Sequence, residues 1–202
     1  MEPFTDKRTG VLLLVSGPSG SGKTTLCRRL ADEGEAVYST SCTTRSAREG
    51  ERDGHDYHFL EREQFQQKVK NGDFLEYAEV HGNYYGTLKS EVIDHLAAGT
   101  DIVMDIDVQG ADQVRACQDL TIKSALVDLF VMPPTDDELL SRLTGRGSDT
   151  QETIKLRMSN ALGEIQHWSK YKYRLLSQSK EQDYSRFKSL LIAERMQTSR
   201  VR

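Results

Sequence analysis

One segment constrains this sequence more than any other: Gly17-Pro-Ser-Gly-Ser-Gly22-Lys23-Thr24, which matches the pattern GxxxxGK[ST] at every fixed position. A continuous apolar run, residues 11–15, precedes it, and a stretch with helical character, residues 23–33, follows it. A buried strand, a glycine-rich turn and a helix in this order are typical of a phosphate-binding loop. The glycines let backbone N–H groups curl around an anion, and the helix N-terminus adds a partial positive charge.

The residue types in this loop suit a nucleoside triphosphate and a metal ion. Lys23 can reach the β- and γ-phosphates, and the Thr24 hydroxyl can ligate Mg²⁺, so we expect Mg²⁺ as the cofactor. The residues expected to bind the triphosphate are Gly17, Pro18, Ser19, Gly20, Ser21, Gly22, Lys23, Thr24 and Thr25.

A second buried strand is expected over residues 101–107, with Asp105 and Asp107 at its end. A carboxylate at that place can hold Mg²⁺ or its water molecules beside the loop, so we assign Asp105, with Thr24, to the metal. At this point a nucleotide hydrolase, a small-molecule kinase and a nucleotide-binding scaffold all remain open.

Strands and helices alternate along the chain, which predicts an α/β fold with a parallel sheet of the P-loop nucleoside triphosphate hydrolase type. Residues 38–86 are rich in charge, glycine and tyrosine, and we predict that they form a flap inserted beside that sheet. The expected strands are 11–15, 101–107, 125–132 and 173–176. The expected helices are 23–33, 61–70, 88–98, one opened by a Thr135–Glu138 capping box, 149–168 and 184–196.

Composition narrows the function further. The chain has 202 residues and a net charge of −4, which argues against a general nucleic-acid binder. The longest apolar run is too short to cross a membrane, and the cysteines are three and far apart, so we expect a cytoplasmic protein without disulfides. His55 and His58 have no third ligand nearby and are expected to be surface or packing residues. A homo-oligomer is compatible with the sequence.

Asp107-Val-Gln-Gly110 matches the DxxG motif of GTPases, but no NKxD sequence for reading guanine occurs in the chain. The flap gives a stronger indication. The segment from Ser41 to Tyr57, SCTTRSAREGERDGHDY, resembles the signature of guanylate kinases, as single-domain bacterial enzymes have it. Further pieces resemble the same family: Phe74-Leu-Glu76, Gly82-Asn-Tyr-Tyr85-Gly-Thr87, Asp105-Ile-Asp-Val-Gln-Gly110 and Arg142-Leu-Thr-Gly-Arg146-Gly147.

The resemblance, which runs from about residue 11 to residue 173, implies transfer of a phosphoryl group from ATP to GMP. It implies a core (1–40, with the phosphate loop, and 91–134), a GMP-binding flap (41–90), a lid (135–160), and a last core segment with the C-terminal helix (161–202). It assigns GMP binding to Ser41, Arg45, Arg48, Tyr57, Glu76, Tyr85, Thr87 and Asp107. It assigns catalysis to Lys23, Arg142, Arg146 and Arg157.

One segment departs from the family. Leu176-Ser177-Gln178-Ser179 stands where the family usually has a Val-Asn-Asp-Asp-like segment, so Ser177 replaces the Asn that lies near adenine. The preference for ATP over other donors therefore stays open. Two alternatives also stay open: a scaffold domain that binds phosphorylated partners, and a kinase with another monophosphate as acceptor.

Overall fold

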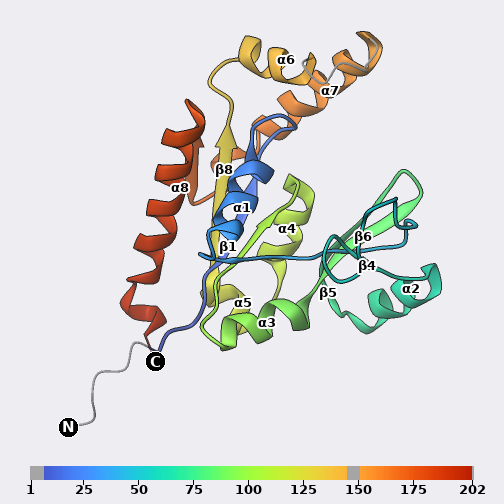
Figure 1. Cartoon of the computed structure of the whole chain (residues 1–202), viewed down its shortest axis with the longest axis vertical. Helices are drawn as coiled ribbons and strands as arrows, with labels where there is room; N and C mark the ends of the chain where they lie inside the picture. The colour runs from blue at the N-terminus through green and yellow to red at the C-terminus, as the bar shows by residue number, and fades with distance from the viewer. Residues whose placement is uncertain (1–6, 145–150, 202) are drawn as a thin grey trace.

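A parallel sheet forms the centre of the protein in the computed structural model, which describes residues 7–144 and 151–201 (Figure 1). The strand order is β2-β7-β1-β8-β9, and each neighbouring pair is parallel. β1 therefore lies in the middle, which places the phosphate loop at the centre of the sheet edge. The strands are β1 (Leu12–Ser16), β2 (Val37–Tyr38), β7 (Ile102–Asp105), β8 (Leu126–Met132) and β9 (Tyr173–Leu176).

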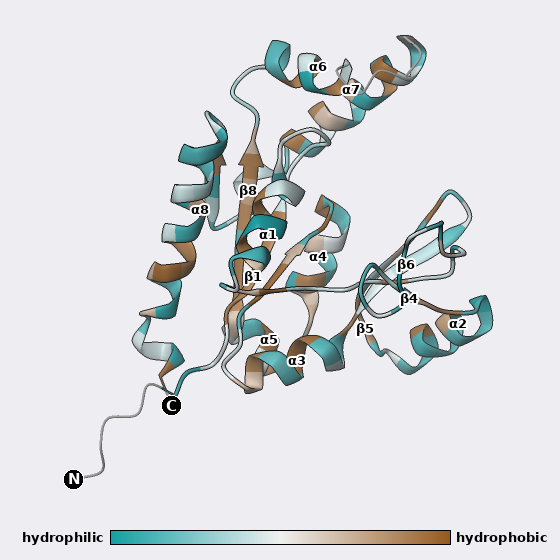
Figure 2. Cartoon of the chain, in the orientation of Figure 1, coloured by the Kyte–Doolittle hydropathy of each residue, from teal (hydrophilic) through white to brown (hydrophobic). Residues whose placement is uncertain are grey.

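Helices cover both faces of this sheet, which explains the continuous apolar run of β1. Because strand side chains alternate, Leu13 and Val15 pack in the cluster that contains residues of α1 and α8. Leu12 and Leu14 pack in the other cluster, with residues of α3, α4 and α5. Figure 2 shows the resulting hydrophobic strands between more polar helices. The helices are α1 (Lys23–Asp32), α3 (Lys89–Ala97), α4 (Val108–Ala116), α5 (Leu120–Ala125) and α8 (Lys180–Arg195).

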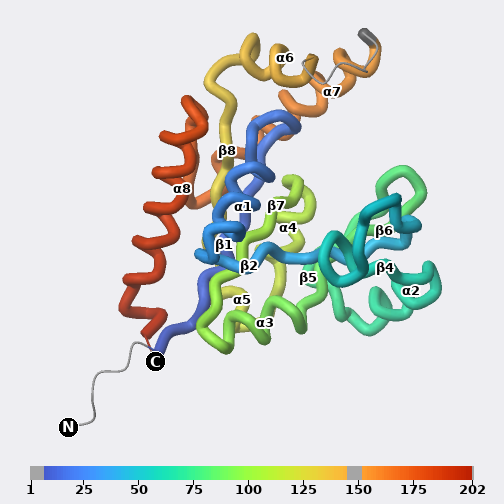
Figure 3. The backbone as a smooth tube through the Cα atoms, viewed as in Figure 1, coloured from blue at the N-terminus to red at the C-terminus, as the bar shows by residue number. Residues whose placement is uncertain are grey.

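A second, smaller sheet lies to one side of the first (Figure 3). Its order is β4-β3-β6-β5, with β5 and β6 antiparallel. Phe65 of the flap helix is fully buried and stacks on Phe74, with ring centroids 4.3 Å apart, and on Tyr84, at 5.3 Å. The flap thus has its own hydrophobic core. Its elements are β3 (Cys42–Thr43), β4 (His58–Phe59), α2 (Arg62–Asn71), β5 (Phe74–Val80) and β6 (Asn83–Leu88).

Two helices, α6 (Asp136–Thr144) and α7 (Gln151–Ile165), lie beyond the C-terminal end of β8 (Figure 1). They pack on each other through Leu139, Leu143 and Ala161. The Thr135 hydroxyl accepts the backbone N–H of Glu138 at 3.1 Å, which is one of the two bonds of the predicted capping box, while the Glu138 carboxylate pairs with Arg142 at 3.0 Å. Arg146 and the predicted helix start at Asp149 lie outside the described residues.

Most predicted elements occur, but several boundaries were wrong. The strand expected over 101–107 ends at Asp105, and Asp107 instead caps α4 by accepting the backbone N–H of Gly110 at 2.8 Å. The last helix starts at Lys180 and not at residue 184, because Ser179 caps it. α7 ends at Ile165, and the segment Trp168–Lys170 forms a 3₁₀ turn.

In the main sheet and its covering helices, the short strand β2 and the helices α4 and α5 were not predicted, and the flap was predicted without bounds for its strands β3, β4, β5 and β6. α4 buries Val108, Ala111 and Val114, a spacing of three that fits one helix face, but it is only nine residues long. The three cysteines are free thiols. No helix in the described ranges is long and apolar enough to cross a bilayer.

Phe65→Ala tests whether the flap core is separate from the main core. We expect a loss of about 3–5 kcal/mol in the stability of the flap, because the truncation removes a fully buried ring. Hydrogen exchange followed by mass spectrometry should show faster exchange in residues 42–88 and little change in β1, β7 and β8. Equal acceleration in both sheets would contradict a separate flap core.

Candidate active site

The phosphate loop joins β1 to α1 and lines a cavity of about 380 Å³. α1 starts at Lys23, directly after Gly22, whose backbone is left-handed at φ 93°. A side chain at Gly17 would place its Cβ 2.4 Å from the Val131 carbonyl oxygen, so only glycine allows β8 to pass this close. Lys23 Nζ donates to the Gly17 carbonyl oxygen at 2.9 Å and so lies against the loop. An anion in this cavity meets a helix N-terminus and an ammonium group.

The carboxylate of Asp105 lies beside the loop because β7 is the direct neighbour of β1. The Thr24 hydroxyl donates to Asp105 Oδ2 at 2.5 Å, and the Tyr38 hydroxyl donates to Asp105 Oδ1. Burial, and next the charge of Asp105, raise the pKa of Tyr38 far above its ordinary value, so Tyr38 remains a donor. The two residues expected to hold a metal ion are therefore in direct contact.

In the flap, Glu51 holds the predicted phosphate-binding arginines. Arg45 forms a two-pronged ion pair with Glu51, with N–O distances of 2.9 and 3.0 Å, and Glu51 also accepts the backbone N–H of Arg48 at 2.7 Å. These contacts, first that with Arg45, lower the pKa of Glu51. The Arg45 guanidinium also lies 5.5 Å from the ring centre of Tyr57, whose ring meets that of Tyr85 edge-on at 6.0 Å.

Glu76 is a buried carboxylate at the base of the flap, with 8% of its surface exposed. Thr87 donates its hydroxyl to Glu76 Oε1 at 2.8 Å, and the Ser41 hydroxyl lies 3.5 Å from that of Thr87. Burial raises the pKa of Glu76, and the charge of Asp107 raises it further. A Cβ at Gly110 would lie 3.3 Å from Glu76 Oε2, so the glycine leaves room for the carboxylate beside α4.

A cavity of about 260 Å³ lies between the flap and the parallel sheet. The flap contributes polar groups, α1 contributes a cation and a hydroxyl, and β7 contributes Asp105. The lining residues are Thr24, Arg28, Tyr38, Ser39, Ser41, Asp56, Tyr57, Thr87, Met104, Asp105 and Ile106. A ligand in this cavity would therefore contact both the flap and the start of α1.

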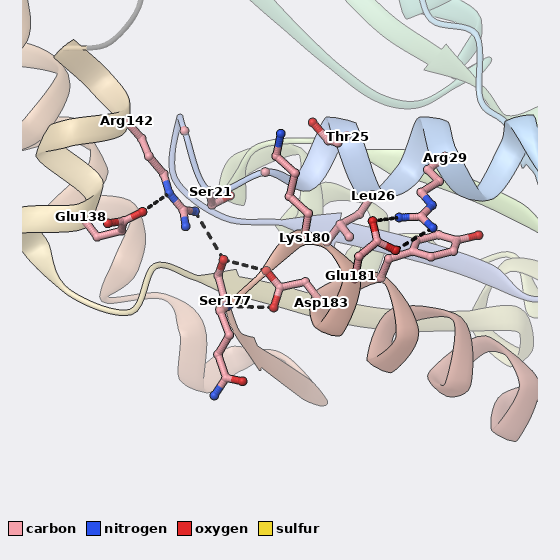
Figure 4. Close-up of a pocket in the computed structure, with 14 residues that line it drawn as sticks. Ser21, Thr25, Leu26, Arg29, Glu138, Arg142, Ser177, Lys180, Glu181 and Asp183 are labelled. Atoms are coloured by element: carbon pink, nitrogen blue, oxygen red, sulfur yellow. Dashed lines mark hydrogen bonds and ion pairs between the residues drawn. The ribbon is translucent and has the colours of Figure 1, made fainter.

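A larger cavity, about 470 Å³, lies on the other side of the phosphate loop, between α1, α6 and the start of α8 (Figure 4). Arg142 of α6 reaches into it and also lines the phosphate-loop cavity. Ser177 and Asp183 form its floor with Tyr184, over whose ring Arg29 stacks at 4.0 Å. This cavity is large enough for a planar base next to the phosphate loop.

The comparisons with known proteins agree with this geometry. A family model described as guanylate kinase matches residues 9–194. The chain belongs to the guanylate kinase family. It is 40% identical over 193 residues to the guanylate kinase of Clostridium tetani, covering 96% of this chain and 90% of that protein. It is 42% identical over 195 residues to that of Bartonella henselae, covering 96% and 86%. The crystal structure of guanylate kinase from Anaplasma phagocytophilum matches with a TM-score of 0.74 at 33% identity, covering 96% and 90%.

The structure gathers most of the residues that the guanylate kinase resemblance assigned. Ser41, Tyr57 and Thr87 line the flap cavity, with Glu76 directly behind Thr87 and Arg45 against Tyr57. Other assigned residues lie at a distance or outside the described chain. The side chain of Arg48 is exposed on the flap, and Arg157 is half-buried on α7 and, among described residues, lines none of the three cavities.

Sequence reasoning missed three residues that position others. Tyr38 bonds to Asp105, Glu51 holds Arg45, and Asp183 bonds to Ser177. Glu51 stands inside the family-like segment, and that position was the only signal available. Nothing local marked Tyr38 or Asp183, because each meets its partner only through the tertiary fold.

Proposed function

We propose that this protein is a guanylate kinase that transfers the γ-phosphoryl group of ATP to GMP and forms ADP and GDP. One observation supports this most strongly: a single cavity is lined by the flap, through Ser41, Tyr57 and Thr87, and by the phosphate-loop helix, through Thr24. An acceptor bound to the flap would therefore face the phosphate loop directly. The product would serve purine nucleotide metabolism and the recycling of GMP.

Glu76 would select guanine. Its carboxylate can accept hydrogen bonds from guanine N1–H and the 2-amino group, whereas adenine has an acceptor at N1 and no 2-amino group. A buried carboxylate left without donors is costly, so a site of this kind discriminates by roughly 10⁴. Ser41 and Thr87 would donate to O6, and Asp107 would assist at the 2-amino edge.

The acceptor phosphate would bind to Arg45, Arg48, Tyr57 and Tyr85. Guanidinium groups and phenols suit a phosphate dianion. The second pKa of a phosphate monoester is about 6, so the attacking oxygen is already largely ionised and needs no general base. The enzyme must overcome the repulsion between two polyanions. Positively charged side chains reduce this repulsion, and positioning brings the two phosphates into reacting distance.

ATP would place its phosphates in the loop, residues 17–25, and its base in the cavity of about 470 Å³. Lys23 and three arginines, Arg142, Arg146 and Arg157, would stabilise the transferring phosphoryl group. We propose closure of the flap (41–90) and the lid (135–160) toward the core segments 1–40, 91–134 and 161–202, because a dry site prevents hydrolysis of ATP. Closure would also bring Arg48 and Arg157 toward the substrates.

Mg²⁺ fits the chemistry of the Thr24 and Asp105 side chains. Within the described ranges, no three His, Cys, Asp or Glu side chains gather into a metal cage. One hydroxyl and one carboxylate nevertheless suffice for Mg²⁺, which keeps several water ligands and binds substrate phosphates. When bound, the ion would neutralise phosphate charge, with Asp105 acting directly or through water. We place the enzyme in the cytoplasm, where both substrates are found.

The proposal is tested by comparing GMP, dGMP, AMP and UMP as acceptors in a coupled assay of ADP release. We expect GMP to have by far the highest kcat/KM and dGMP a lower one. The kcat/KM for AMP should be lower than that for GMP by roughly 10⁴. Glu76→Ala should remove most of the preference for GMP over AMP. ADP release that does not depend on GMP would contradict the proposal.

The raised pKa of Glu76 predicts the pH dependence of guanine binding. Only the ionised carboxylate accepts both hydrogen bonds, so binding should weaken as the pH falls through that raised pKa, above the pH at which an ordinary glutamate is protonated. Inhibition by guanosine, which has no phosphate to titrate, isolates the effect. We expect its inhibition constant to rise on acidification in the wild type and to stay constant, at a higher value, in Glu76→Gln. A flat profile in the wild type would contradict the assignment.

A further inference from the structure

A chain of three hydrogen-bonded side chains links α6 to the start of α8 (Figure 4). Arg142 Nη1 donates to Ser177 Oγ at 3.3 Å, and Ser177 Oγ donates to Asp183 Oδ2 at 2.8 Å. The other carboxylate oxygen, Asp183 Oδ1, accepts the backbone N–H of Gln178 at 2.8 Å. Ser177 and Asp183 are 2% and 7% exposed, so the inner part of the chain is held within the protein.

The chemistry of the three groups fixes the direction of this chain. A guanidinium group only donates hydrogen bonds, and an ionised carboxylate only accepts them. The single hydroxyl proton of Ser177 is therefore directed to Asp183. Its oxygen is left as an acceptor toward Arg142. Asp183 thus keeps Ser177 in the one orientation that receives the arginine.

Among the residues that the structure describes, Ser177 connects Arg142 to the central sheet. The ion pair between Arg142 Nε and Glu138 Oε1, 3.0 Å long, lies within α6, so Glu138 moves with the helix. Ser177 directly follows β9, and its backbone N–H bonds to the Met132 carbonyl oxygen at the end of β8. Its position is therefore set by the central sheet.

The arginine held in this way lies at the junction of two cavities. Arg142 lines both the large cavity beside α8 and the phosphate-loop cavity. A Cβ at Gly20 of the loop would lie 3.5 Å from Arg142 Cβ, so the backbones of α6 and the loop are close. If Arg142 changed its orientation, its guanidinium group would no longer lie beside the phosphate loop.

We propose that Ser177 is a positioning residue that, oriented by Asp183, holds Arg142 over the phosphate loop. Its role rests on the proposed function, because Arg142 is there assigned to the transferring phosphoryl group. Ser177 also lines the cavity assigned to the ATP base, but its hydroxyl is already engaged by Asp183 and Arg142, so we expect it to act through Arg142. The flap cavity, assigned to the acceptor, is lined by other residues.

The test is a double-mutant cycle with Ser177→Ala, Arg142→Ala and the double variant. We expect Ser177→Ala to lower kcat about tenfold, the scale of one hydrogen bond to a charged group, with the KM for GMP unchanged within twofold. The Ser177 change should have no further effect when Arg142 is already alanine. Asp183→Asn should also lower kcat, because its amide can donate to Ser177 Oγ and compete with Arg142.

Ser185→Ala, on the exposed side of α8, is the matched control and should behave as the wild type.

The same cycle is measured on the affinity for ATP without GMP, by calorimetry, where Ser177→Ala should weaken binding only if Arg142 is present. The measurement of ATP affinity separates the positioning role of Ser177 from the proposed transfer to GMP, because it involves no transfer to GMP. Equal losses from Ser177→Ala with and without Arg142, or no loss at all, would overturn the positioning role. Non-additive ATP binding in a protein that does not phosphorylate GMP would uphold it and reject the proposed acceptor.

Discussion

The binding of phosphate at the N-terminus of α1 is the interaction on which the rest of the site depends. A buried central strand fixes where the loop begins, and Gly17 allows β8 to pass beside the loop. Because β7 pairs with β1, the end of β7 places Asp105 next to Thr24. The flap follows β2 and the α6–α7 pair follows β8 (Figure 1). Ser41 of the flap lines a cavity together with Thr24 of α1, and Arg142 of α6 lines the phosphate-loop cavity.

Charge explains why three separate parts of the chain contribute to one site. Two nucleotides with facing phosphates repel each other strongly, and cations spread over several elements can surround those phosphates from more than one side. In the structure, Arg45 pairs with Glu51, Arg142 with Glu138 and Ser177, and Lys23 with a carbonyl oxygen of the loop. In the proposed mechanism, a phosphate group would replace or join the partner of each cation.

The sequence predicted what depends on local pattern. The phosphate loop, its flanking strand and helix, and the place of Asp105 at the end of a strand beside the loop follow from local sequence pattern. The flap residues were found through their likeness to the guanylate kinase signature. What the sequence did not predict depends on tertiary contact. The strand β2 is only two residues long, and Tyr38 meets Asp105 because β2 joins the sheet. Asp183 meets Ser177 because α8 begins four residues earlier than its apolar spacing indicated.

The central claim is that loop, flap and lid cations converge on one chain of phosphates. The most direct measurement is a crystal structure with guanosine and adenosine joined through five phosphates, a ligand that spans both nucleotide sites. The account predicts that Lys23, Arg45 and Arg142 each lie about 2.7–3.2 Å from a phosphate oxygen, with guanine against Glu76. A bound ligand whose phosphates lie outside the loop, with Arg45 paired only with Glu51, would contradict it.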